Sequence, residues 1–163
     1  NLISALEWAT CVAIGPGLGQ DTWSETTFEA VMQYCFTNNK PLVIDADALN
    51  LLSQSPQPVT SAVLTPHPGE AARLLNCTTA EIQADRFTKL NELINHYEAV
   101  VVLKGVGTLL GALGRLPAIC TAGNPGMATA GMGDVLTGII GESKAKEKID
   151  AFYSRAYCSA VSH

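Results

Sequence analysis

The sequence has few charged residues, no long apolar run and no excess of basic residues. Charged residues make up 15% of the 163 positions and hydrophobic residues 47%, a balance that excludes an intrinsically disordered chain. No apolar run approaches the roughly 20 residues that a membrane-spanning helix needs, so we expect no such span. The net charge of −5 and the pI of about 5.1 exclude a basic nucleic-acid-binding surface.

Clustered metal ligands and targeting signals are also missing. Residues 1–10 lack a basic stretch followed by an apolar core, which excludes a secretory signal, and the start at Asn1 indicates that the translated N-terminus is not included. No CxxC pair and no Cys/His cluster occurs, so we expect no structural zinc and a reduced, cytoplasmic setting. Five scattered cysteines are expected to act as small hydrophobic residues: Cys11, Cys35, Cys77, Cys120 and Cys158.

The hydrophobic pattern alternates between strands and helices and shows neither a repeat nor a linker. It therefore predicts one α/β domain, three-layered, with a mostly parallel central sheet flanked by helices. We expect strands over 9–14, 41–44, 62–64 and 99–103, and weaker ones over 108–110 and 118–120. We expect helices over 22–37, from 48 to 52, over 69–75, a longer one from the capping box at Thr78 through Tyr97, and one over 134–140.

Each of the first four strong strands is followed by an unusual polar or glycine-rich string. The strings are GPGLG (15–19), DAD (45–47), TPHPGE (65–70) and KGVGT (104–108). In a parallel sheet, ligands bind beyond the carboxyl ends of the strands. We therefore expect all four strings to gather at one edge and to form a single cleft.

Ten of the 14 glycines lie between Gly105 and Gly141, and the densest string is GNPGMATAGMGD (123–134). Glycines ahead of a helix leave backbone N–H groups free to bind phosphate. Asp134 in the first turn would repel phosphate and is better suited to take a proton from an attacking hydroxyl. Helix capping is the alternative role for Asp134, but the upstream glycines favour the catalytic one.

The other strings leave two interpretations each. GPGLG fails the dinucleotide pattern GxGxxG because Gln20 takes the last position, so the string alone is a weak signal, and a tight strand-to-helix turn without a binding role is one interpretation of it. KGVGT is not a Walker A loop, since Lys104 precedes the glycines. It is either a nucleotide-phosphate contact through the backbone and Thr108, or a hairpin corner with a solvated Lys104.

The remaining polar candidates are two carboxylates and one histidine. Asp45 and Asp47 end a strand, where one of them could hold Mg²⁺ through water, or Asp47 could cap the next helix. His67 stands between two prolines on a rigid loop. It either donates a hydrogen bond to a ligand or is a structural histidine bonded to backbone.

These strings, in this order, resemble the ADP/ATP-dependent NAD(P)H-hydrate dehydratases. TPHPGEAARLL and GNPGMATAGMGDVLTGIIG are the most specific of them, and the match runs from about Ala9 to Gly141. The resemblance implies a ribokinase-like fold of which residues 1–141 form an incomplete part, because family domains begin with further strands. Residues 142–163 differ from the family and are expected to be an atypical C-terminal tail.

The resemblance implies repair of hydrated NADH or NADPH, with ADP or ATP and Mg²⁺, in a cytoplasmic homo-oligomer for which a tetramer is one arrangement. The PHPGE string resembles the bacterial members of the family, which favours ADP over ATP. By resemblance, Asp134 is the catalytic base and contacts the hydrate, with Gly17, Gly19 and His67. The implied nucleotide-binding residues are Lys104, Gly105, Val106, Gly107, Thr108, Gly131 and Gly133. The alternatives are a ribokinase-like small-molecule kinase and an inactive nucleotide-binding fragment.

Overall fold

The computed structural model of the protein describes residues 2–60 and 62–120. Six expectations from the sequence concern residues outside these ranges: the sites at Asp134, Gly131 and Gly133, the helix over 134–140, the tail over 142–163, and the environment of Cys158. They stay predictions. Within the described residues, the strand and helix boundaries can be compared directly with the expectations.

Within the described residues, a six-stranded sheet forms the centre of the fold, in the order β1-β2-β3-β4-β5-β6. Strands β1 to β4 are parallel, and β5 and β6 continue the sheet as antiparallel neighbours. All six predicted strands are confirmed, although β1 begins three residues later than expected. The strands are β1 (Val12–Ile14), β2 (Leu42–Ile44), β3 (Ala62–Leu64), β4 (Val100–Leu103), β5 (Thr108–Gly111) and β6 (Ala118–Cys120).

The helices follow the expected order with three differences. Helix α1 was not predicted from the sequence, α3 begins two residues earlier than expected, and the single helix expected from Thr78 is two helices. The described helices are α1 (Leu2–Trp8), α2 (Thr22–Thr37), α3 (Ala46–Gln54), α4 (Pro68–Leu74), α5 (Thr79–Ala84) and α6 (Arg86–Tyr97).

Asp85 is the reason for the break between α5 and α6. Its backbone leaves the helical region, with φ −146° and ψ 80°, and its carboxylate accepts hydrogen bonds from the N–H and hydroxyl groups of Thr88. Aspartate competes with helix continuation in this way because its short side chain bonds nearby backbone donors. The capping box at Thr78 and Glu81 is present as predicted, but it opens only the short α5.

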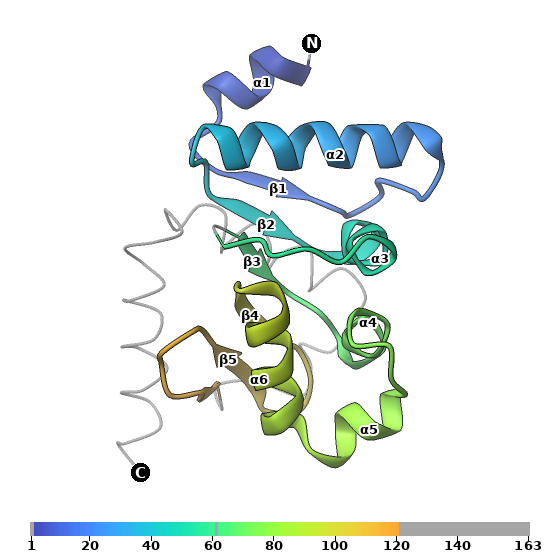
Figure 1. The fold of residues 1–163 in the computed structure, drawn as a ribbon, viewed down its shortest axis with the longest axis vertical. Coiled ribbons are helices and arrows are strands. Elements are labelled where there is room, and N and C mark those ends of the chain that lie inside the picture. Colours follow the sequence, from blue (N-terminus) through green and yellow to red (C-terminus); the bar gives the residue numbers. More distant parts are fainter. Residues whose placement is uncertain (1, 61, 121–163) are drawn as a thin grey trace.

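The two faces of the sheet carry separate apolar clusters, as alternating side chains in a strand require. Ile44, Leu64 and Leu103 belong to the larger cluster, which also contains buried residues of α2, α3, α4, α5 and α6. Val43, Val63 and Val102 belong to the cluster on the opposite face. Figure 1 shows α2 beside β1 and α6 across β4 and β5. The described helices therefore cover one face and leave the carboxyl ends of the strands to loops.

One sequence-based exclusion, the absence of a membrane-spanning helix, and one predicted role, that of the cysteines, can be compared with the described residues. None of the described helices combines the length and the apolar character needed to cross a membrane. Cys35 is 2% exposed on the buried side of α2, and burial raises the pKa of its thiol to about 11. The predicted role of this cysteine as a small hydrophobic residue is therefore confirmed, while Cys11 and Cys77 are half-buried free thiols.

Candidate functional site

Loops that follow the parallel strands are joined by backbone hydrogen bonds at the carboxyl edge of the sheet. The N–H of Asp45 donates to the carbonyl of Ile14 at 3.0 Å, and the N–H of Thr65 to that of Ile44 at 3.2 Å. Further along, the N–H of Lys104 donates to the carbonyl of Pro66 at 2.8 Å. The predicted convergence of the four strings on one edge is confirmed.

The GPGLG string forms a tight turn that lies against the second string. The N–H of Leu18 donates to the carbonyl of Gly15 at 3.0 Å, and the N–H of Gly19 donates to the Oδ2 of Asp47 at 2.9 Å. Gly15 has φ +135°, and a Cβ atom there would lie 1.7 Å from the carbonyl oxygen of Asp45. Only glycine allows the two strings to approach this closely.

Asp45, and not Asp47, caps helix α3, so the capping alternative named the wrong carboxylate. Asp45 has extended backbone, and its side chain accepts a hydrogen bond from the N–H of Ala46 at 2.9 Å. Asp47 lies in the first turn of the helix and bonds Gly19 instead. The assignment differs because β2 ends at Ile44 and α3 begins directly after Asp45, two residues earlier than the apolar pattern indicates.

Lys104 is bound to two carboxylates of the site. Its Nζ lies 2.8 Å from Oδ1 of Asp45 and 3.9 Å from Oε2 of Glu70. The side chains of Lys104, Asp45 and Glu70 are 20%, 1% and 7% exposed. The antiparallel pairing of β4 and β5 confirms the interpretation of KGVGT as a hairpin corner. The prediction that Lys104 is solvated there is wrong. The buried charge on Asp45 requires a partner, and Lys104 supplies a cation within reach of it.

His67 caps helix α4 with its ring. Its Nδ1 accepts hydrogen bonds from the N–H groups of Gly69 and Glu70 at 2.9 Å and 3.3 Å. The N–H of His67 in turn donates to the Oε2 of Glu70 at 2.7 Å. Because Nδ1 is an acceptor, the neutral ring carries its proton on Nε2, which lies 3.4 Å from Oε1 of Glu70. The backbone-bonded alternative is therefore confirmed. Since the side chain is 51% exposed, donation to a ligand stays a prediction.

Arg86 is the site residue that sequence reasoning missed. It begins α6, and its guanidinium donates to four carbonyls of the segment that contains KGVGT. Its Nε is buried and has no hydrogen-bond partner within the described residues. Burial lowers the pKa of this guanidinium. The position of Arg86 was a signal in the sequence, because a basic residue in the first turn of a helix interacts unfavourably with the helix dipole. Such a residue is expected to have a compensating contact elsewhere.

The described residues offer no ready-made metal centre. Within 2–60 and 62–120, no group of three or more His, Cys, Asp or Glu side chains is arranged to hold a metal ion. Asp45 is bound to Lys104 and the N–H of Ala46, and Asp47 to the N–H of Gly19. The two carboxylates that the sequence offered for Mg²⁺ thus already have protein partners.

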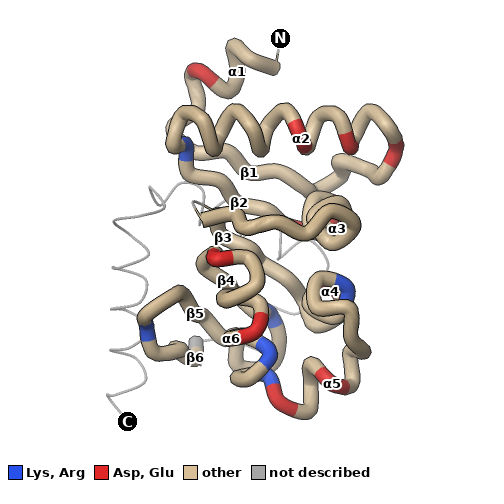
Figure 2. Tube along the Cα trace, in the orientation of Figure 1, with Lys and Arg blue, Asp and Glu red and all other residues tan. Residues whose placement is uncertain are grey.

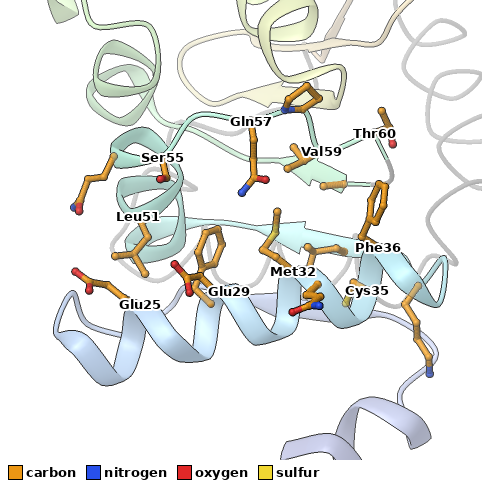
Figure 3. Close-up of a pocket in the computed structure, with 17 residues that line it drawn as sticks. Glu25, Glu29, Met32, Cys35, Phe36, Leu51, Ser55, Gln57, Val59 and Thr60 are labelled. Atoms are coloured by element: carbon orange, nitrogen blue, oxygen red, sulfur yellow. The ribbon is translucent and has the colours of Figure 1, made fainter.

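A cavity of about 770 Å³ lies at the other end of the sheet. It is lined by α2, the end of α3 and residues 55 and 57–60, and it includes Leu42 and Ala62, the first residues of β2 and β3. Figure 3 shows Met32 and Phe36 of α2 facing Gln57 and Val59 across it. This cavity is remote in the fold from the four strings, which end the strands, so it is not part of the candidate site.

Solved structures with the same fold belong to the ribokinase-like class. A ribokinase-like superfamily protein of Enterococcus faecalis superimposes with a TM-score of 0.76 at 32% identity, over 87% of this chain and 49% of that one. The ADP/ATP-dependent NAD(P)H-hydrate dehydratase of Bacillus subtilis, co-crystallised with ATP and Mg²⁺, gives a TM-score of 0.71 at 28% identity, over 88% and 52%. The α/β sheet with its loops gathered at one edge is therefore a ribokinase-like fold.

The sequence model of the NAD(P)H-hydrate dehydratase family matches residues 1–163, so the chain belongs to that family. It is 47% identical to the bifunctional NAD(P)H-hydrate repair enzyme of Escherichia coli over all of this chain and 30% of that enzyme. It is 42% identical to the ADP-dependent (S)-NAD(P)H-hydrate dehydratase of Neisseria meningitidis, over 82% of this chain and 46% of that one. The chain thus spans less than half the length of these relatives.

Proposed function

We propose that the protein to which these residues belong is an ADP-dependent (S)-NAD(P)H-hydrate dehydratase. The observation that carries the proposal is the joined carboxyl edge, where Lys104 links the KGVGT string to Asp45 and Glu70 of two other strings. Membership of the NAD(P)H-hydrate dehydratase family supports hydrated NADH or NADPH as the substrate class proposed for this edge. We propose in addition that residues 1–141 are part of the ribokinase-like domain and that 142–163 are an atypical C-terminal tail.

The proposed reaction restores a reduced nicotinamide that has added water. The hydroxyl of the hydrate attacks the terminal phosphorus of ADP, AMP leaves, and a base removes the hydroxyl proton. The electron pair of the ring nitrogen then expels phosphate, and loss of a ring proton restores the double bond. Hydrate and ADP become NADH or NADPH, AMP and phosphate, with no oxidant or reductant consumed.

Residue roles follow the sequence-based assignment and the described contacts. Asp134 is proposed as the base, with Gly131 and Gly133 at the phosphate. Residues 104–108 are proposed to contact the nucleotide. His67, with its half-exposed ring at the same edge, and the turn at Gly17 and Gly19 are proposed to contact the hydrate. The capping contact of His67 and the hydrogen bond from the N–H of Gly19 to Asp47 would position these loops before substrate arrives.

The described carboxylates do not fit a protein-held Mg²⁺ site, because Asp45 and Asp47 already accept hydrogen bonds from protein donors. No step is therefore assigned to the metal. Mg²⁺ is proposed to enter with the nucleotide phosphates, as it commonly does in nucleotide-dependent enzymes. We further propose that ADP is preferred over ATP, and that the enzyme is a cytoplasmic homo-oligomer.

The test uses protein expressed from its complete reading frame. Hydrated NADH with ADP should regenerate the absorbance of NADH and yield AMP and phosphate in equal amounts. Asp134→Asn should lower kcat by at least about 100-fold, because general base catalysis contributes that much. Asp21→Asn is the matched control, since Asp21 caps α2, and asparagine is also a good N-cap.

Three outcomes decide between the functions. Unimpaired turnover by Asp134→Asn would overturn its role as base. Phosphoryl transfer to a small alcohol with no regeneration of NADH would favour the kinase alternative. ADP binding without any turnover of either substrate class would favour the inactive nucleotide-binding fragment.

A further inference from the structure

Arg86 holds the segment between β4 and β5 from one side. Its Nη1 donates to the carbonyls of Val106 and Gly107 at 2.6 Å and 3.0 Å. Its Nη2 donates to those of Leu103 and Lys104 at 3.1 Å and 3.3 Å. The remaining carbonyl of this stretch, that of Gly105, accepts from the hydroxyl of Thr108 at 3.4 Å. All five carbonyls from 103 to 107 thus have donors, four of them on one guanidinium.

The direction of these carbonyls fixes the direction of the N–H groups. No described peptide bond is cis, and in a trans peptide the C=O of one residue is opposed to the N–H of the next. The N–H groups of Gly105 and Gly107 therefore point away from Arg86. Within the described residues, neither of these two N–H groups donates to a protein acceptor. Within residues 2–60 and 62–120, these two backbone donors of one short loop therefore have no protein acceptor.

Glycine is required for this arrangement at Gly105. Its φ is +145°, and a Cβ atom would lie 3.0 Å from Nη2 of Arg86. The next residue, Val106, is fully exposed, so the loop is open to a ligand. Successive N–H groups turned outward in this way form a concave site for anions and other acceptors.

Charge adds to the same effect. Figure 2 shows basic positions close together where α6 begins. Lys89 and Lys104 of this region are paired with Glu92 and Asp45, whereas the partners of the Arg86 guanidinium are carbonyl oxygens. The guanidinium therefore offsets the negative ends of the carbonyl dipoles, and the outward side of the loop stays positive.

We propose that Arg86 is a positioning residue for the nucleotide: it turns the carbonyls of 103–107 inward so that the N–H groups of Gly105 and Gly107 meet acceptor atoms of ADP. This inference rests on the proposed function, because the loop's role in nucleotide binding is itself proposed. Pre-organised donors bind more tightly because the loop need not be ordered on binding. Lysine could supply the charge but not the planar fork that reaches four carbonyls.

The test measures ADP affinity by titration calorimetry on protein from the complete reading frame. Arg86→Met and Arg86→Lys should each raise the Kd for ADP by about tenfold or more, because ADP binding would then have to order the loop over 104–108. The KM for the hydrate should change less than twofold. Lys89→Met is the matched control on the same helix, and its Kd should equal that of the wild type. Thermal unfolding identifies any variant that fails to fold.

Chemical rescue separates positioning from general stability. Guanidinium ion at millimolar concentration should restore ADP affinity to Arg86→Ala, whereas ammonium at equal ionic strength should not. Wild-type affinity in Arg86→Met, or full recovery in Arg86→Lys, would overturn the inference while leaving the proposed function in place. A wild type that binds no ADP would overturn both. A wild type that binds ADP but does not dehydrate the hydrate would overturn only the proposed reaction, and the calorimetry would still decide the role of Arg86.

Discussion

The Nζ of Lys104 lies 2.8 Å from the Oδ1 of Asp45, although 59 positions separate the two residues in the sequence. Asp45 directly follows β2 and Lys104 directly follows β4, and β3 lies between these strands in the sheet. The contact therefore bridges the carboxyl ends of three strands. It fixes the candidate site as one unit and not as separate loops.

Removal of the Lys104 charge should destabilise the fold. Lys104→Met leaves the 1% exposed carboxylate of Asp45 without its cation, and breaking a buried pair in this way costs about 3 kcal/mol. Urea unfolding measures the change in free energy. The double variant with Asp45→Asn should recover part of the loss, because the amide is neutral and still caps α3.

Lys89→Met provides the matched comparison for that prediction. In the wild type, the Nζ of Lys89 lies 2.7 Å from the carboxylate of Glu92, whose side chain is 42% exposed. Exposed pairs contribute under about 1 kcal/mol, so this variant should unfold close to the wild type. Equal losses in Lys104→Met and Lys89→Met would contradict the structural role given to the buried pair.

Gly15→Ala and Gly17→Ala should differ sharply although the residues are two positions apart. The new Cβ at Gly15 would lie 1.7 Å from the carbonyl oxygen of Asp45, which is backbone and cannot rotate away. We expect a loss of more than about 4 kcal/mol or no soluble protein. Gly17 has φ +68° with open space around it, so alanine there should cost about 1 kcal/mol. Soluble yield and urea unfolding measure both, and similar losses would refute the predicted contact.

Stability should fall in acid because three helix caps depend on ionised carboxylates. Hydrogen bonds lower the pKa values of Asp21, Glu81 and Asp85, chiefly from the N–H of Ser24, the hydroxyl of Thr78 and the N–H of Thr88, respectively. A lowered folded-state pKa gives stability that is complete above the ordinary value of about 4 and is lost as the pH falls through the lowered value.

The pH dependence is measured by urea unfolding between about pH 6 and about pH 3. The triple variant Asp21→Asn, Glu81→Gln and Asp85→Asn keeps side chains that accept hydrogen bonds but cannot titrate. Its midpoint should therefore change less with pH than that of the wild type. An identical acid dependence in the two proteins would show that other groups control it.

Local sequence patterns predicted most of the elements. Helix α2 has the predicted bounds, because Phe28, Val31 and Cys35 recur at helical spacing and bury one face. The strands of the sheet were visible as short apolar runs. The break at Asp85 was missed because the apolar stripe continues from Ile82 to Leu90 across it, while the capping bonds to Thr88 interrupt the backbone.

The candidate site was predicted in position but not in its contacts. Alternation of strands and helices was enough to place the four strings on one edge. The capping role of His67 was one of two alternatives, and the choice required the N–H groups of Gly69 and Glu70 to be in reach. Arg86 was missed because its partners among residues 2–60 and 62–120 are backbone carbonyls, which leave no pattern of side chains in the sequence.

By itself, the sequence determined the fold class, the order of the elements, the edge of the sheet that carries the site and the resemblance to the dehydratase family. These depend on hydrophobic periodicity and on short strings, which are local. The tertiary structure alone decided that Asp45 caps α3, that Lys104 is paired and half-buried, and that Arg86 shapes the loop over 104–108. These depend on which groups lose their water when distant strands pair, and each buried charge or carbonyl then bonds the donor that the fold brings within reach.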